Sequence, residues 1–170
     1  IGAAGDLVDR GIVASLARPG GNVTGLSFIS RELTGKHLEL LKEAAPKISR
    51  VAVLLNPANP AFGGLMADLE DAARALGLRL QRMEARGAED FAAAFAESAK
   101  ISAHALLIVN DAIFNNHRQQ IADLAVKHRL PAIHERNEFA EAGGLMAYGP
   151  SLPDMHRRAA VLVDKILKGT

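Results

Sequence analysis

Three apolar runs along the chain end abruptly in polar or turn-forming residues. The first, RVAVLL at residues 50–55, leads into an asparagine, and the second, ALLIV at residues 105–109, leads into an Asn-Asp pair. The third, LMAY at residues 145–148, leads into Gly-Pro, and a helical pattern follows each run. Runs of this kind are typical of parallel strands that are buried on both faces of a sheet.

Strand-like and helix-like patterns alternate along the whole chain. The sequence predicts strands at residues 1–4, 23–28, 50–55, 78–84, 103–109, 130–133 and 145–148. It predicts helices at residues 6–17, 32–45, 61–76, 88–100, 116–128, 135–142 and 153–167. Strands joined by helices form parallel sheets, so the expected fold class is α/β, a Rossmann-like parallel sheet flanked by helices. Residues 51–55 and 106–109 should be central and buried, whereas the alternating residues 78–84 indicate an edge strand.

Composition narrows the possible functions. The chain has 170 residues, of which 49% are hydrophobic and only 4% aromatic, as expected for a sheet covered by helices. Its net charge of +1 comes from 20 basic and 19 acidic residues without a basic stripe, which argues against a nucleic-acid partner. It has no cysteine, which excludes disulfides and thiolate chemistry. No apolar run reaches the roughly 18 residues that a membrane-spanning helix needs.

Polar side chains follow the central strands at the point where each strand ends. In an open α/β sheet, ligands bind beyond the carboxyl ends of the strands, so Asn56, Asn59, Asn110, Asp111 and Tyr148 are candidate ligand-binding residues. The alternative for Asn56 and Asn59 is a turn and helix-capping role. For Asp111 the alternative is capping of the next helix, although the periodic pattern places that helix a few residues further on. Tyr148 could stack on a ring-bearing ligand or pack at the rim.

Two further positions are weaker candidates. Asp6 follows a glycine at the end of the first strand and could face a cleft, although a helix-capping role is the commoner one there. His134 and Glu135 are adjacent at a predicted strand end and could form a metal ligand or a general base, but no two histidines have metal-ligand spacing. No site for a metal or a cofactor is therefore predicted.

The motifs of catalysis are missing from the sequence. It contains neither GxGxxG nor GxxxxGK[ST], and it has no GxSxG elbow for a nucleophilic serine. Polar hydrogen-bonding residues at strand ends without an activated nucleophile favour reversible binding over an enzymatic reaction.

The segments ARPGGNVTG, LLNPANP and GGLMAYGPSLPD, with most of the sequence between them, resemble ABC-transporter substrate-binding proteins of the tryptophan/tyrosine type. The resemblance implies a type I periplasmic-binding-protein fold, in which a ligand lies between two Rossmann-like lobes. In that fold residues 1–28 would be part of lobe 1, residues 29–150 a nearly complete lobe 2, and residues 151–170 a helix that returns to lobe 1. The chain would then be a fragment of a longer protein.

The same resemblance implies the function. The expected protein is an extracytoplasmic solute-binding component of an ABC uptake transporter, located in the periplasm or at the cell surface, with a membrane permease as partner. Its solute would be small and polar or zwitterionic, with aromatic amino acids as one implied class. The alternative is a ligand-sensing domain of the same fold in a receptor or transcriptional regulator. Apolar helix faces at residues 6–17 and 153–167 further predict self-association of the fragment as a dimer.

Overall fold

The computed structural model describes residues 7–8, 11–27, 30–59 and 64–169. The chain divides into two compact units. The sheet unit comprises Arg31–Gly149, and the terminal unit comprises Ile1–Ser30 together with Pro150–Thr170. The predicted strand at residues 1–4 lies outside the described residues.

The sheet unit is built on five parallel strands in the order β2-β1-β3-β4-β5. These are β1 (Arg50–Leu55), β2 (Arg79–Glu84), β3 (Ala105–Ile108), β4 (Ala132–His134) and β5 (Met146–Ala147). Strands β1 and β3 have neighbours on both sides and are buried along nearly their whole length, whereas β2 lies at an edge. The predicted fold class and the placement of these three strands are therefore confirmed.

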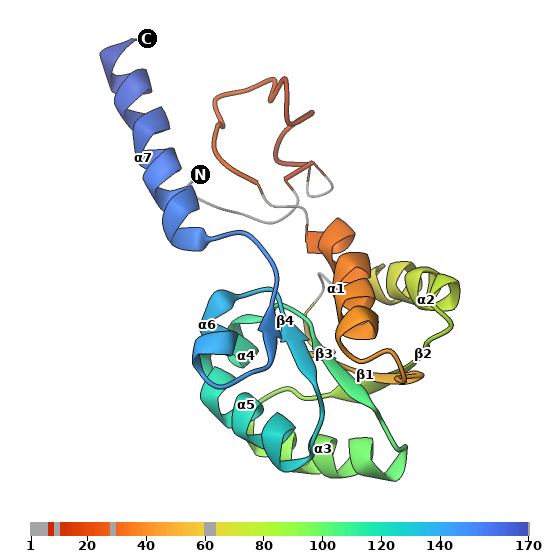
Figure 1. Cartoon of the computed structure of the whole chain (residues 1–170). Helices are drawn as coiled ribbons and strands as arrows, with labels where there is room; N and C mark the ends of the chain where they lie inside the picture. Colours follow the sequence, from red (N-terminus) through yellow and green to blue (C-terminus); the bar gives the residue numbers. More distant parts are fainter. Residues whose placement is uncertain (1–6, 9–10, 28–29, 60–63, 170) are drawn as a thin grey trace. The chain divides into compact units, whose positions relative to one another are not determined.

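Helices cover both faces of this sheet (Figure 1). Helices α1 (Ser30–Ala44) and α2 (Leu65–Ala75) supply apolar side chains to one core cluster. Helices α3 (Phe91–Lys100), α4 (Ala112–Asn116), α5 (Arg118–Lys127) and α6 (Asn137–Glu141) supply the other, and a 3₁₀ turn at Ala88–Asp90 precedes α3. Side chains alternate along each strand, so Val53 packs in the first cluster and Leu54 in the second.

One short helix beside the site was not predicted from the sequence. The predicted helix at residues 116–128 corresponds to α5 (Arg118–Lys127), and α4 (Ala112–Asn116) precedes it as a separate helix. Helix α4 begins earlier than the hydrophobic pattern indicates, because Asp111 caps it with a side-chain oxygen that accepts a hydrogen bond from the Ile113 backbone N–H. A short capped helix has too few residues to show a period, which explains why the sequence did not reveal it.

The terminal unit contains the wrong predictions. Residues 7–8 and 11–17 form turns and bends in place of the predicted helix, and residues 23–27 contain only an isolated bridge at Ser27 in place of the predicted strand. Gly11 adopts a left-handed φ of 66°, and its N–H bonds to the Val8 carbonyl in a tight turn. That conformation stops helix propagation although the apolar spacing fits a helix. Helix α7 (Leu152–Lys168) is present as predicted, capped by Ser151.

Removal of a core side chain from β3 should be costly, whereas removal of the same side chain from the surface should not. Leu107 is fully buried in the middle of the sheet, so Leu107→Ala should lower the free energy of unfolding by about 2–5 kcal/mol. The matched control is Leu145→Ala, because Leu145 is exposed, and it should change the stability by less than about 0.5 kcal/mol. Urea denaturation measures both. Equal losses for the two variants would contradict the burial of Leu107 in the middle of the sheet.

Candidate functional site

Three of the predicted site residues are joined by hydrogen bonds at the carboxyl edge of the sheet. Asn59 Nδ2 donates to Asp111 Oδ2 at 2.8 Å, and Asn56 Nδ2 donates to the same oxygen at 3.3 Å. The contact exists because β1 and β3 pair in parallel, which brings the residues that follow Leu54 and Ile108 to the same edge. The structure therefore brings three of the five described candidate residues into contact with one another.

The carboxylate of Asp111 is the centre of this cluster and is buried, with 5% of its surface exposed. Its second oxygen, Oδ1, accepts the Ile113 N–H at 2.8 Å, so both oxygens have partners within the chain. Asn56 is also buried, and its Oδ1 accepts the Ala58 N–H at 3.0 Å, which closes a turn after β1. Capping and turn formation, the alternatives for these residues, are therefore both realised, and Asp111 holds the two asparagines in place.

The other predicted residues lie apart from this hydrogen-bonded cluster. Asn110 Oδ1 accepts a hydrogen bond from Asn115 Nδ2 at 2.9 Å, which ties the end of β3 to α4. Tyr148 follows β5 at the same edge of the sheet, and its side chain is 43% exposed. Asp6 lies outside the described residues.

The backbone of Tyr148 is held by His37 of α1. The His37 ring is buried, and burial lowers its pKa, so the neutral ring is favoured. Its Nε2 lies 2.5 Å from the Tyr148 carbonyl oxygen, so Nε2 carries the hydrogen and donates it. The two rings meet edge to face with their centroids 6.1 Å apart. The sequence does not predict this contact, because His37 and Tyr148 are far apart along the chain.

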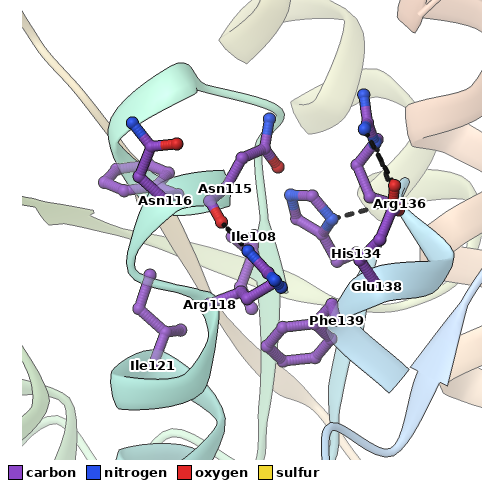
Figure 2. A pocket seen from close by; sticks show the side chains of 10 residues that line it. Ile108, Asn115, Asn116, Arg118, Ile121, His134, Arg136, Glu138 and Phe139 are labelled. Atoms are coloured by element: carbon purple, nitrogen blue, oxygen red, sulfur yellow. Dashed lines mark hydrogen bonds and ion pairs between the residues drawn. The ribbon is translucent and has the colours of Figure 1, made fainter. Parts of the chain in front are cut away.

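A pocket of about 240 Å³ opens beside this rim, beyond the ends of β3 and β4 (Figure 2). We call it the His134 pocket. Its apolar walls are Ile108, Phe114, Ile121 and Phe139. Its polar lining comes from α4, α5, the end of β4 and the region of α6, and consists of Asn115, Asn116, Arg118, His134, Arg136 and Glu138. Of these residues, only His134 was a candidate from the sequence, as a weak metal ligand or general base, and neither arginine was predicted.

The imidazole of His134 is the buried polar group of this pocket, with 3% of its surface exposed. Its Nδ1 accepts the Arg136 backbone N–H at 2.8 Å, and its Nε2 has no hydrogen-bond partner among the described residues. Burial lowers the pKa of His134 from the ordinary 6.5 to about 4. Its side chain packs against Phe139, with ring centroids 5.7 Å apart.

The charges that line the pocket are partly compensated. Arg136 donates to Glu138 through Nε at 3.3 Å and through a terminal nitrogen at 3.0 Å. This pairing lowers the pKa of the Glu138 carboxyl. Arg118 donates to the Asn115 backbone carbonyl at 3.1 Å, and among the described residues it forms no ion pair. Arg118 also helps to lower the pKa of the Glu138 carboxyl, so two arginines share one carboxylate and the lining carries one net positive charge.

Neither a metal centre nor a membrane span is evident in the described part of the chain. No group of three histidine, cysteine, aspartate or glutamate side chains among those residues is arranged to hold a metal ion. No helix formed by them is sufficiently long and apolar to cross a bilayer.

An open parallel sheet covered by helices, with polar groups gathered at its carboxyl edge, defines a ligand-binding α/β protein of the periplasmic-binding-protein type. Residues 1–170 match the family model described as ABC transporter substrate binding protein, so the chain belongs to this family. The family consists of binding proteins and not of enzymes, in agreement with the prediction from the sequence. The resemblance to ABC-transporter substrate-binding proteins is therefore confirmed.

A tyrosine-binding protein of Clostridioides difficile is 25% identical over 166 residues, which cover 96% of this chain and 47% of that protein. A conserved domain protein from Vibrio cholerae superposes with a TM-score of 0.83 and 26% identity, over 97% of this chain and 55% of the other. An ABC domain from Streptococcus pneumoniae in complex with L-Trp has a TM-score of 0.82 and 19% identity, over 99% and 58% of the two chains. The chain thus spans about half the length of these relatives.

The buried His134 should make stability depend on pH. Between its ordinary pKa of 6.5 and the value of about 4 in the folded protein, the unfolded chain binds a proton that the folded chain does not. Stability should therefore be complete above about pH 6.5 and fall as the pH drops toward 4, by on the order of 3 kcal/mol from this group.

Urea denaturation at about pH 7 and about pH 5 gives the free energy of unfolding at each pH. The difference between the two values is compared between variants, because the substitutions can also change the stability at both pH values. His134→Phe should reduce the pH dependence, because the titrating group is lost. The control His156→Phe, at an exposed position of α7, should retain it. An undiminished pH dependence in His134→Phe would rule out this residue as its source.

Proposed function

We propose that the whole protein is the extracytoplasmic solute-binding component of an ABC uptake transporter, active in the periplasm or at the cell surface and delivering its solute to a membrane permease. Membership of the substrate-binding family supports the solute-binding role. In this proposal the sheet unit is one lobe, with residues 29–150 as its extent, and residues 1–28 and 151–170 belong to the other.

The observation that carries the proposal is the polar rim at the carboxyl edge of the sheet. Asn56, Asn59, Asn110, Asp111 and Tyr148 all follow strands that run in the same direction, and ligands of open α/β sheets bind at this edge. In the proposed site, the exposed ring of Tyr148 stacks on the solute and the amides of the asparagines donate and accept hydrogen bonds. Asp111 orients the asparagines, and Asp6 belongs to the same proposed set.

The proposed solute is small and polar or zwitterionic, with aromatic amino acids as the first class to test. Two relatives support that choice, namely the tyrosine-binding protein of C. difficile and the S. pneumoniae protein whose structure contains L-Trp. Amide, carboxylate and aromatic side chains at one rim match the ammonium, carboxylate and ring of such a molecule.

A ligand-sensing domain is the alternative function. A LacI-family transcriptional regulator from Bifidobacterium animalis superposes with a TM-score of 0.67 at 15% identity, which is a likeness of fold alone. The near-neutral charge of this chain gives no support to a nucleic-acid-binding role for the chain itself. A secretion signal ahead of the family domain would favour the transporter, and a basic helix-turn-helix there would favour the regulator.

Replacement of Asp111 tests the proposed rim. In the full-length protein, Asp111→Ala should weaken the binding of L-tyrosine or L-tryptophan by about 1.5–3 kcal/mol, because the rim loses a charged hydrogen-bonding group and the asparagines lose their support. Isothermal titration calorimetry measures the affinity. Asp123→Ala on α5 is the matched control, since Asp123 is exposed and its side chain bonds to Gln119.

The same variant should also lose stability through the missing helix cap, by about 0.5–2 kcal/mol, so thermal unfolding is recorded alongside calorimetry. If Asp111→Ala stays folded and binds with unchanged affinity, Asp111 is a capping residue only. If the unaltered protein binds neither amino acid, the proposed solute class is wrong.

Self-association of this chain stays a prediction. Helix α7 exposes large apolar side chains on one face, including Val163 at 54% and Ile166 at 60%, and burial of each is worth about 1.5–3 kcal/mol. We expect a two-fold dimer through this face, detected by sedimentation equilibrium and weakened by Val163→Glu with Ile166→Glu. The control is Leu145→Glu in the sheet unit. A monomer at all concentrations, or equal effects of the two sets of substitutions, would contradict the prediction.

A further inference from the structure

The His134 pocket contains a buried hydrogen-bond donor that lacks an acceptor. A backbone N–H can only donate, so the bond from the Arg136 N–H to Nδ1 requires a lone pair on that nitrogen. The neutral ring therefore carries its hydrogen on Nε2, and this N–H has no partner in the described chain. A buried donor without an acceptor is unfavourable, so an oxygen that reached it would gain a hydrogen bond.

The electrostatics of the pocket favour an oxygen that carries negative charge. The charged groups that line it are Arg118, Arg136 and Glu138. Arg136 and Glu138 neutralise each other through two hydrogen bonds. The guanidinium of Arg118 makes one hydrogen bond, to a backbone carbonyl, and it helps to lower the pKa of the Glu138 carboxyl. Two arginines and one glutamate leave one net positive charge in the lining, and the remaining N–H groups of Arg118 can donate to an anion.

The walls of the pocket favour an anion attached to an organic body. Ile108, Phe114 and Phe139 line it with apolar surface, and Figure 2 shows His134 between the side chains of Asn115 and Arg118 on one side and those of Arg136 and Glu138 on the other. The Glu138 carboxylate would repel a second negative charge more strongly than a single one. A monoanionic carboxylate next to an apolar group therefore fits better than a dianion such as sulfate.

We propose that the His134 pocket is the subsite for the carboxylate of an organic solute, with the Nε2–H of His134 and the guanidinium of Arg118 as its donors. The hydrogen bond between Asn110 and Asn115 joins this pocket to the polar rim. Rim and pocket therefore lie at the same edge of the sheet, and a solute at the rim could place its carboxylate in the pocket. That this carboxylate belongs to the transported solute rests on the proposed function.

The probe for this subsite is benzoate, with benzyl alcohol as a neutral molecule of similar shape. In NMR titrations of the ¹⁵N-labelled chain, benzoate should shift the His134 imidazole resonances saturably, with an affinity at least about tenfold above that of benzyl alcohol. Sulfate should bind more weakly than benzoate. Similar responses to benzoate and benzyl alcohol, or no response to either, would overturn the proposal and leave a water-filled pocket. A stronger response to sulfate would overturn the assignment to a carboxylate.

Two substitutions identify the donors. Arg118→Gln should lower the benzoate affinity about tenfold, whereas Lys127→Gln, which removes the same charge from an exposed position of the same helix, should not. His134→Phe should weaken benzoate similarly, followed through the methyl resonances of Ile108, and His134→Gln should restore part of the loss because it keeps an N–H donor. Equal effects of Arg118→Gln and Lys127→Gln would overturn the role of Arg118.

These results separate the subsite from the proposed function. Benzoate binding that depends on Arg118, in a full-length protein that binds neither L-tyrosine nor L-tryptophan, would support the subsite and contradict the solute class. Conversely, amino-acid binding by calorimetry that is unchanged in Arg118→Gln, in a protein without a benzoate response, would overturn the subsite and leave the proposed function standing.

Discussion

The parallel pairing of β1 with β3 is the interaction on which the candidate site depends. It aligns Leu54 with Ile108, so the residues that follow the two strands emerge at the same edge of the sheet. Asp111 then accepts hydrogen bonds from Asn56 and Asn59, although more than fifty residues separate them in the chain. Burial of both strands holds this register, since a shift by one residue would turn their apolar side chains toward the wrong core cluster.

The rim illustrates how one carboxylate serves several purposes. Asp111 caps α4, links the ends of β1 and β3 by hydrogen bonds and orients two amides. All of these bonds stabilise the unliganded chain. Such a group can position a binding surface without itself contacting the solute. The His134 pocket differs, because there the described chain leaves a donor without an acceptor and a lining with one net positive charge. Fully satisfied groups build the frame of the site, and the unsatisfied ones indicate where a ligand adds free energy.

Close packing around this edge also depends on glycine. A Cβ at position 144 would lie 2.2 Å from the Phe139 ring, and one at position 149 would lie 2.3 Å from the Glu135 carbonyl oxygen. The two glycines therefore allow β5 and its flanking loops to approach α6, and Phe139 can then form a wall of the His134 pocket. His37 holds the far end of the same segment through the Tyr148 carbonyl.

The sequence by itself determined the α/β class, the central strands β1 and β3, the edge strand β2 and the strand-end location of the polar residues, because unbroken apolar runs have few other folds available. Prediction from the sequence failed at residues 7–8 and 11–17, where Gly11 turns the chain despite helical spacing. It also failed at α4, where a side-chain cap replaces periodicity. Only the tertiary structure brought Arg118, His134 and Arg136 around one pocket and left the His134 Nε2–H without an acceptor. Such a result depends on burial and on contacts between distant segments, which no local pattern encodes.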